Sequence, residues 1–136
     1  MKEFLLDANM VVRFLVQDDL KQSVAATALF EKAERREVAL HLDALVVAEA
    51  VYVLTGRYGR SRTEVVNVLL AMIQNAGIVT REEEMVTDAL RRFAACNVDF
   101  SDAWLASRGA QLRRPVASFD RDLDKFKDIK RFEPTA

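Results

Sequence analysis

Short apolar runs alternate with longer helical stretches along this chain, and that alternation restricts the folds open to it. The runs at 4–6, 38–42, 78–80 and 116–119 predict strands. The stretches between them repeat apolar residues every three or four positions, which predicts helices. Strands that alternate with helices pair in parallel and are joined by right-handed crossovers. The sequence therefore predicts an α/β fold built on a parallel sheet.

Some of these elements carry more specific signals. The run at 4–6 is apolar throughout instead of alternating, which predicts a strand covered on both faces. Ser61 and Glu64 form a capping box that opens a helix, and Gly77 is expected to end that helix. A helix over 20–35 is expected to bury a face made of Val24, Ala25, Ala28, Leu29 and Ala33.

The composition is that of an ordinary globular protein, with 51% apolar and 30% charged residues. No linker, repeat or low-complexity segment divides the 136 residues, so residues 1–136 are expected to form a single domain. No apolar run approaches the roughly 20 residues that span a bilayer, and Asp7 interrupts the start too early for a signal peptide. Cys96 is the only cysteine, which excludes an internal disulfide. We therefore expect a cytoplasmic protein with no membrane partner.

Charge and rare residue types narrow the possible chemistry. The net charge of −1 argues against a generic basic nucleic-acid binder. One histidine, His41, and one cysteine argue against a structural zinc site, which needs about four such ligands. They also argue against Ser-His-Asp or Cys-His catalysis, and no glycine-rich phosphate loop is present. The remaining candidates are the acids.

Two acids directly follow predicted strands. Asp7 follows the first strand and Asp120 the fourth. In an open α/β sheet, ligands bind outside the carboxyl ends of the strands, near the point where strand order reverses. The two acids are therefore expected to face one crevice, although Asp7 could instead only cap the next helix. Asp122 and Asp124, just beyond, are expected to be solvated or capping.

Two further acids have apolar surroundings on predicted helices. Glu49 has as helix neighbours Leu45, Val46, Tyr52 and Val53, so its carboxylate is expected to be partly buried. Such a group needs a metal, a proton or a buried salt bridge. Asp102 precedes the apolar Leu105 and Ala106, but it could simply favour the first turn of a helix capped by Asp99.

Four clustered carboxylates would repel one another unless cations occupied the site. Hard oxygen ligands suit Mg²⁺, with Mn²⁺ as a substitute. Two such ions about 4 Å apart can activate a water molecule and stabilise the leaving oxygen of a phosphodiester. The acids therefore favour metal-dependent hydrolysis.

At four places the sequence resembles the PIN domain family, and within it the VapC-type toxins of toxin–antitoxin pairs. The resemblance covers nearly the whole chain, in order. Its motifs are Leu5-Leu6-Asp7-Ala8-Asn9, Val47-Ala48-Glu49-Ala50-Val51-Tyr52-Val53-Leu54, Asp99-Phe100-Ser101-Asp102-Ala103-Trp104-Leu105-Ala106 and Ser118-Phe119-Asp120-Arg121-Asp122.

The resemblance implies a three-layer α/β/α domain with a short central parallel sheet of four to five strands. It also implies a Mg²⁺-dependent endoribonuclease that an antitoxin holds inactive and that forms a homodimer. The family's catalytic and metal-binding acids fall on Asp7, Glu49, Asp102 and Asp120. Accessory positions fall on Asn9 and Ser118, which would orient the acids, and on Asp99.

A possible RNA contact lies in the middle of the chain. Arg57, Arg60 and Arg62 surround Tyr58, and such a patch can hold an RNA backbone and stack a base. The alternative is a group of solvated arginines at a break between helices.

Two other functions stay open. A PIN-like scaffold without activity would bind RNA and not cleave it. A haloacid-dehalogenase-like phosphatase would use Asp7 as nucleophile, but it needs a second Asp where this chain has Asn9. A phospho-acceptor receiver is disfavoured because no Asp follows the strand at 78–80.

Overall fold

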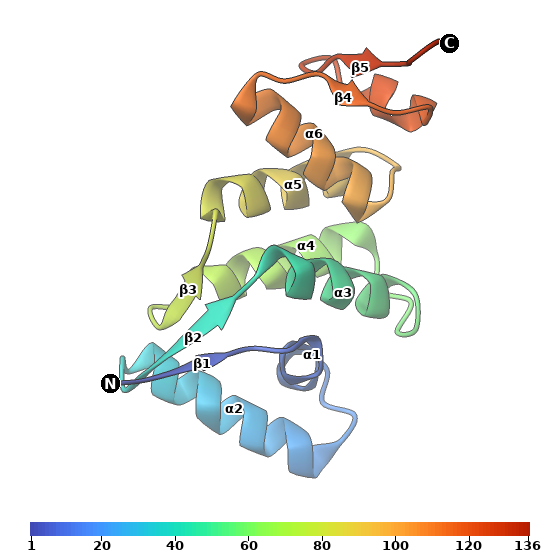
Figure 1. Cartoon of the computed structure of the whole chain (residues 1–136). Helices are drawn as coiled ribbons and strands as arrows, with labels where there is room; N and C mark the ends of the chain where they lie inside the picture. Colours follow the sequence, from blue (N-terminus) through green and yellow to red (C-terminus); the bar gives the residue numbers. More distant parts are fainter. The chain divides into compact units, whose positions relative to one another are not determined.

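The computed structural model describes all residues from 1 to 136 (Figure 1). The chain divides into two compact units, Met1–Glu82 (the first unit) and Glu83–Ala136 (the second unit). The first unit contains β1 (Lys2–Leu5), α1 (Ala8–Leu15), α2 (Leu20–Glu34), β2 (Val38–Leu42), α3 (Ala44–Thr55), α4 (Arg62–Ile73) and β3 (Ile78–Thr80). The second contains α5 (Glu83–Ala95), α6 (Phe100–Leu112), β4 (Val116–Ala117), the 3-10 helix η1 (Arg121–Lys125) and β5 (Arg131–Phe132). This order confirms the predicted α/β class.

The first unit contains a three-stranded parallel sheet in the order β1-β2-β3. The central strand β2 is the core, with Leu40 and Leu42 at most 1% exposed. At the edge, Phe4 is 41% and Leu5 is 81% exposed, and only Leu6 is buried. The prediction that this first strand is covered on both faces is therefore wrong. An edge strand pairs with a single neighbour, and a row of apolar residues does not distinguish an edge from a centre.

Helix α2 packs with a face that only partly matches the predicted one. Its buried residues are Ser23, Ala26, Phe30 and Ala33. Of the predicted residues, Ala33 is buried and Leu29 is half-buried, whereas Val24, Ala25 and Ala28 are exposed. The ring of Phe30 stacks on Phe14 of α1 with centroids 4.0 Å apart. Ser23 is buried because its hydroxyl donates to the carbonyl of Val16 at 3.2 Å. The hydrogen bond of Ser23 and the large ring of Phe30 thus determine which face of α2 is buried.

Helix α4 begins with the predicted capping box. The hydroxyl of Ser61 accepts from the amide of Glu64 at 3.1 Å and lies 3.3 Å from its carboxylate. The helix ends at Ile73 with Gln74 as its cap, so the prediction that Gly77 ends it is wrong. Gly77 instead lets the start of β3 approach the end of α2. A Cβ there would lie 2.6 Å from the Cα and from the carbonyl carbon of Ala33.

We expect Gly77→Ala to destabilise the chain by at least about 2 kcal/mol, because backbone atoms of α2 cannot rotate away as a side chain can. Urea unfolding of parent and variant measures the loss. Gly59→Ala is the contrast, because Gly59 has open space around its Cβ position and a φ of 59°. That variant should lose only about 1 kcal/mol, the cost of a left-handed backbone. Equal losses would contradict the crowding at Gly77.

The second unit packs α5 against α6 beside a two-stranded parallel sheet of β4 and β5. Phe93 and Phe100 meet edge to face at the start of α6, with centroids 6.0 Å apart. Five strands are thus present, three in the sheet of the first unit and two in the sheet of the second, and every strand pair is parallel. No helix of the chain combines the length and apolarity needed to cross a membrane. The single domain over residues 1–136 stays a prediction.

Candidate metal centre

Three acids of the second unit lie together where α6 begins and where the chain leaves β4. One carboxylate oxygen from each of Asp102, Asp120 and Asp122 lies within 4.8 Å of the others. Asp102 is in the first turn of α6, Asp120 caps η1, and Asp122 lies inside η1. The loop thus brings two acids separated by one residue to the start of a helix that carries the third.

Backbone hydrogen bonds fix the loop that carries two of these acids. The amide of Asp120 donates to the hydroxyl of Ser118 at 2.9 Å. The Oδ1 atom of Asp120 accepts from the amide of Asp122 at 2.9 Å, which fixes the direction of that carboxylate. Ser118 thus holds the backbone of Asp120, and its expected role in orienting the acids stays a prediction.

The cluster carries excess negative charge. The pKa of Asp102 is raised, first by burial and then by the charges of Asp120, Asp99 and Asp122, whereas Lys125 acts in the opposite direction. The Nζ atom of Lys125 lies 3.3 Å from Asp122 Oδ1 and also donates to the carbonyl of Asn97 at 2.9 Å. One lysine thus offsets part of the repulsion, and a divalent cation would relieve the rest.

The donor set fits a hard cation. All three groups offer carboxylate oxygens, which Mg²⁺ and Mn²⁺ prefer, and no histidine or cysteine belongs to the cluster. Asp99 is the backbone cap of α6, but its side chain makes no capping hydrogen bond. Its charge nevertheless acts on Asp102. Asp99 therefore adds to the negative charge around Asp102, and its accessory role stays a prediction.

Asp122 is a member of the cluster that the sequence did not predict, since it was expected to be solvated or capping. The spacing Asp120-Arg121-Asp122 was the available signal, because a single helical turn after a strand can direct alternate acids toward one point. Asp124, two residues further, does not join the cluster. Its carboxylate is paired with Arg131, with Nε and Oδ1 2.9 Å apart.

The two other predicted acids belong to the first unit. Asp7 caps α1, with its Oδ1 accepting from the amide of Met10 at 2.8 Å. Asp7 therefore caps the helix, as the alternative interpretation of the sequence proposed, but it uses only Oδ1 to do so. Its other oxygen stays available to a ligand. Asp7 is exposed, as is Asn9 in the first turn of α1. The convergence of Asp7 with the acids of the second unit stays a prediction.

Glu49 lies on α3 and is exposed, so the expectation that it is partly buried is wrong. Its helix neighbours Leu45 and Tyr52 are themselves 80% and 79% exposed. The apolar residues around Glu49 therefore mark an uncovered face of α3. Glu49 makes no ion pair, which also removes the alternative of a buried salt bridge.

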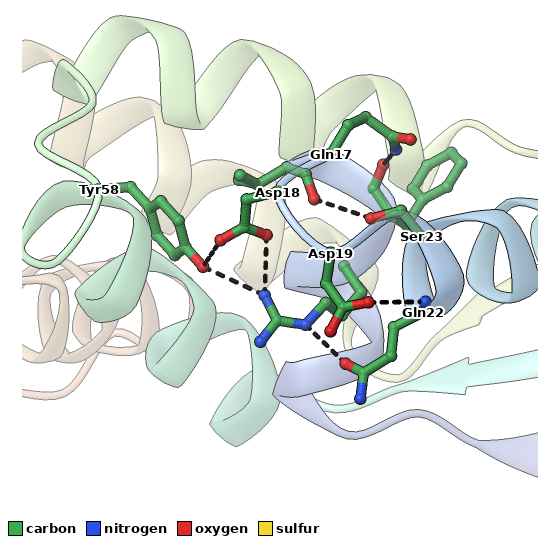
Figure 2. A network of polar contacts seen from close by, with 9 residues as sticks. Gln17, Asp18, Asp19, Gln22, Ser23 and Tyr58 are labelled. Carbon is green, nitrogen blue, oxygen red and sulfur yellow. Dashed lines mark hydrogen bonds and ion pairs between the residues drawn. The ribbon is translucent and has the colours of Figure 1, made fainter.

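The aromatic residue of the predicted RNA patch is part of a polar network within the first unit (Figure 2). The hydroxyl of Tyr58 donates to Asp18 Oδ2 at 2.8 Å and accepts from Arg13 at 3.2 Å. Arg13 also binds Asp18 at 3.0 Å and Gln22 at 2.7 Å. The Tyr58 hydrogen bond is the main cause that lowers the pKa of Asp18. Tyr58 thus ties the loop after α3 to the loop after α1.

The arginines of the patch are arranged around this network. The Arg57 guanidinium lies 5.7 Å from the centre of the Tyr58 ring, and Arg60 forms an exposed ion pair with Glu64 at 3.9 Å. The structure therefore gives Tyr58 a structural role. The RNA contact of Arg57, Tyr58, Arg60 and Arg62 stays a prediction.

Parallel strands alternating with helices, and an acidic cluster beside a strand, define an α/β protein with a candidate divalent-metal centre. The profile of the PIN domain matches residues 4–129, a range that includes all the acids above. The chain therefore belongs to the PIN domain family. PIN domains are three-layer α/β/α proteins and are generally metal-dependent nucleases, so the family supports a nuclease with a divalent metal. No curated protein matches the chain.

Proposed function

We propose that this protein is a Mg²⁺-dependent endoribonuclease. The observation that carries the proposal is the cluster of Asp102, Asp120 and Asp122, with its excess negative charge, inside a chain of the PIN domain family. The only histidine, His41, is paired with Glu3 of the neighbouring strand at 2.7 Å and does not belong to the acidic cluster. The acids are therefore the best-supported chemical groups.

Four acids are proposed to be required for catalysis and metal binding: Asp7, Glu49, Asp102 and Asp120. Asp122 joins them on the strength of its place in the cluster. When bound, Mg²⁺ or Mn²⁺ would supply activation of water and neutralisation of the charge at phosphorus. The carboxylates would hold the ion and orient the scissile phosphate, with Asn9, Ser118 and Asp99 as accessory residues. Water would add to phosphorus with loss of a proton while the P–O3′ bond breaks and O3′ takes up a proton, which gives a 5′-phosphate and a 3′-hydroxyl.

The biological setting is also a proposal, and it rests on resemblance to VapC-type toxins. In that setting the protein is the toxin of a type II toxin–antitoxin pair, acts in the cytoplasm, and is restrained by a cognate antitoxin protein. It would form a homodimer and have RNA as its substrate. The exposed apolar face of α3, with Leu45 and Tyr52, agrees with a protein that has a partner.

Cleavage of labelled single-stranded RNA in Mg²⁺, in Mn²⁺ and in chelator tests the proposal. We expect internal cleavage with either metal, none in chelator, and products with a 5′-phosphate and a 3′-hydroxyl. Products ending in a 2′,3′-cyclic phosphate would mean that the ribose hydroxyl attacked, and the proposed hydrolysis would be wrong. Binding without cleavage in any metal would instead indicate a scaffold. A stable phosphate ester on Asp7 would indicate a phosphatase.

A further inference from the structure

A basic hollow opens at the end of α6 that is opposite to the acidic cluster. It has a volume of about 340 Å³, and its lining includes Gly109, Arg113, Arg114, Asp128 and Lys130. The three basic side chains are exposed and take part in no ion pair. We define this basic hollow by Arg113, Arg114 and Lys130.

The one acid that lines the basic hollow does not neutralise it. Asp128 accepts from Arg92 through both oxygens, with Arg92 Nη1 2.8 Å from Oδ1. That pairing holds the pKa of the Asp128 carboxyl below its usual range, so Asp128 is ionised. Arg92 also pairs with Asp88 at 2.6 Å, so Arg92, Asp88 and Asp128 together carry one net negative charge. The three positive charges of Arg113, Arg114 and Lys130 exceed it, and the basic hollow keeps an excess of positive charge.

The frame of the basic hollow is closely built. A Cβ added at Gly109 would lie 3.1 Å from the carbonyl oxygen of Arg114 and 3.2 Å from the Cγ2 of Val116. Glycine therefore lets the turn after α6 pack directly on the helix. The amides of Arg113 and Arg114 both point to the carbonyl of Gly109, at 3.0 Å for Arg114. The two arginines thus project from a fixed turn.

Arg113 has a left-handed backbone conformation, which favours glycine over residues with a side chain. It caps α6 with φ 54° and ψ 49°, in the left-handed region where helices commonly end on glycine. An arginine there costs conformational energy that glycine would not. Arg36 and Glu82 also have a positive φ, so the strain alone assigns no role, but the strained side chain of Arg113 is the one that lines the basic hollow.

We propose that the basic hollow binds phosphates of an RNA backbone, at a second contact away from the acidic cluster. The planar guanidinium of arginine can donate two parallel hydrogen bonds to two oxygens of one phosphate, and the ammonium of lysine adds a positive charge. Asp102 and Arg113 are separated by eleven residues, about 16 Å along a helix at 1.5 Å per residue. An RNA strand held at the acids would reach the basic hollow only over several nucleotides. The inference deepens the proposed nuclease function and rests on it for the identity of the anion.

The test measures binding of a long single-stranded RNA and of a dinucleotide to the full chain, by fluorescence anisotropy in chelator so that no cleavage occurs. Arg113→Gly removes one cation and relieves the left-handed backbone. It should melt at or above the parent, bind the long RNA several-fold more weakly, and bind the dinucleotide unchanged. The slope of log affinity against log salt concentration should become shallower by about 0.7 for each phosphate that the variant no longer neutralises. Lys130→Gln should reproduce the binding effect.

Arg36→Gly is the matched control. Arg36 follows the end of α2 with φ 61°, so the change removes the same charge and relieves the same conformation outside the basic hollow. It should bind RNA as the parent does. Equal binding by Arg113→Gly and the parent, or equal weakening by both variants, would overturn the proposal. If Arg113→Gly weakened binding to polyglutamate and not to RNA, the proposal would also be wrong, because the occupant would be an acidic protein segment.

The two proposals fail in different ways. If no metal supports cleavage but Arg113→Gly still weakens RNA binding, the basic hollow stands and the nuclease fails. If RNA is cleaved but the variant binds as the parent does, the nuclease stands and the basic hollow fails.

Discussion

Asp102→Asn should reduce RNA cleavage by at least about 100-fold, because the loss of even an outer-shell partner of a metal site costs 10- to 100-fold. Asparagine keeps the shape of the side chain at the first turn of α6 and removes its charge. Initial rates at saturating Mg²⁺, normalised to folded protein, measure the effect. Asp124→Asn is the control in the same unit, because Asp124 is paired with Arg131 outside the cluster. It should keep nearly full activity.

Although Asp102→Asn should lower activity, it should not lower the stability of the metal-free protein. The pKa of Asp102 is raised in the folded chain by burial and by neighbouring acids. Above that pKa its charge opposes folding, and the penalty shrinks as the pH falls below it and is gone below the ordinary pKa of an aspartate. In chelator at neutral pH, Asp102→Asn should therefore melt at or above the parent, and the difference should shrink toward acidic pH. Mg²⁺ should raise the melting temperature of the parent more than that of the variant.

A variant that melts far below the parent in chelator would make Asp102 a structural residue.

Asp122→Asn tests whether Asp122 belongs to the metal site. Asp122 lies in the acidic cluster, but it is not one of the four acids implied by the resemblance to the PIN domain family. If Asp122 holds the ion with Asp102 and Asp120, its replacement should also lower the rate at limiting Mg²⁺. An unchanged Mg²⁺ dependence would remove Asp122 from the site.

Local signals in the sequence predicted the elements well. Asp7 and Ser61 cap their helices through their side chains, because a cap depends on atoms within three residues, whereas Asp99 caps α6 without a side-chain hydrogen bond. The alternation of strands and helices indicated the α/β class for the same reason. The sequence could not predict which face of a helix or strand is buried, because burial depends on contacts with distant parts of the chain.

The errors share that cause. The apolar residues of β1 and those around Glu49 indicated burial, yet Leu5 and Tyr52 are exposed. On α2 the predicted stripe was displaced because Ser23, a polar residue, is buried through its hydrogen bond to Val16. In the same way, the local pattern around Tyr58 gave no sign that Arg13 and Asp18, far along the chain, bind its hydroxyl. In each case the burial or the contacts of a side chain depend on residues far along the chain, which the local sequence pattern cannot predict.

The exposure of Glu49 changes what its replacement should do. A partly buried, unpaired glutamate would burden the metal-free fold, so Glu49→Gln would have been stabilising. On the open face of α3, its carboxylate is solvated and makes no ion pair. Replacement of an exposed side chain changes stability by no more than about 0.5 kcal/mol. In chelator, parent and Glu49→Gln should therefore unfold at nearly the same urea concentration.

Cleavage by Glu49→Gln should nevertheless fall by at least about 100-fold, if Glu49 helps to hold the metal or its water. The control is Glu31→Gln on α2, where the same change falls on another exposed glutamate and should leave the rate unchanged. Raising Mg²⁺ separates the two roles of the carboxylate. Recovery of the rate at high Mg²⁺ would mean that Glu49 contributes to affinity for the ion, whereas a constant deficit would mean that it orients the reacting groups. A variant that cleaves as fast as the parent at every Mg²⁺ concentration would show that Glu49, although it matches the family's acid, is an ordinary solvated residue of α3.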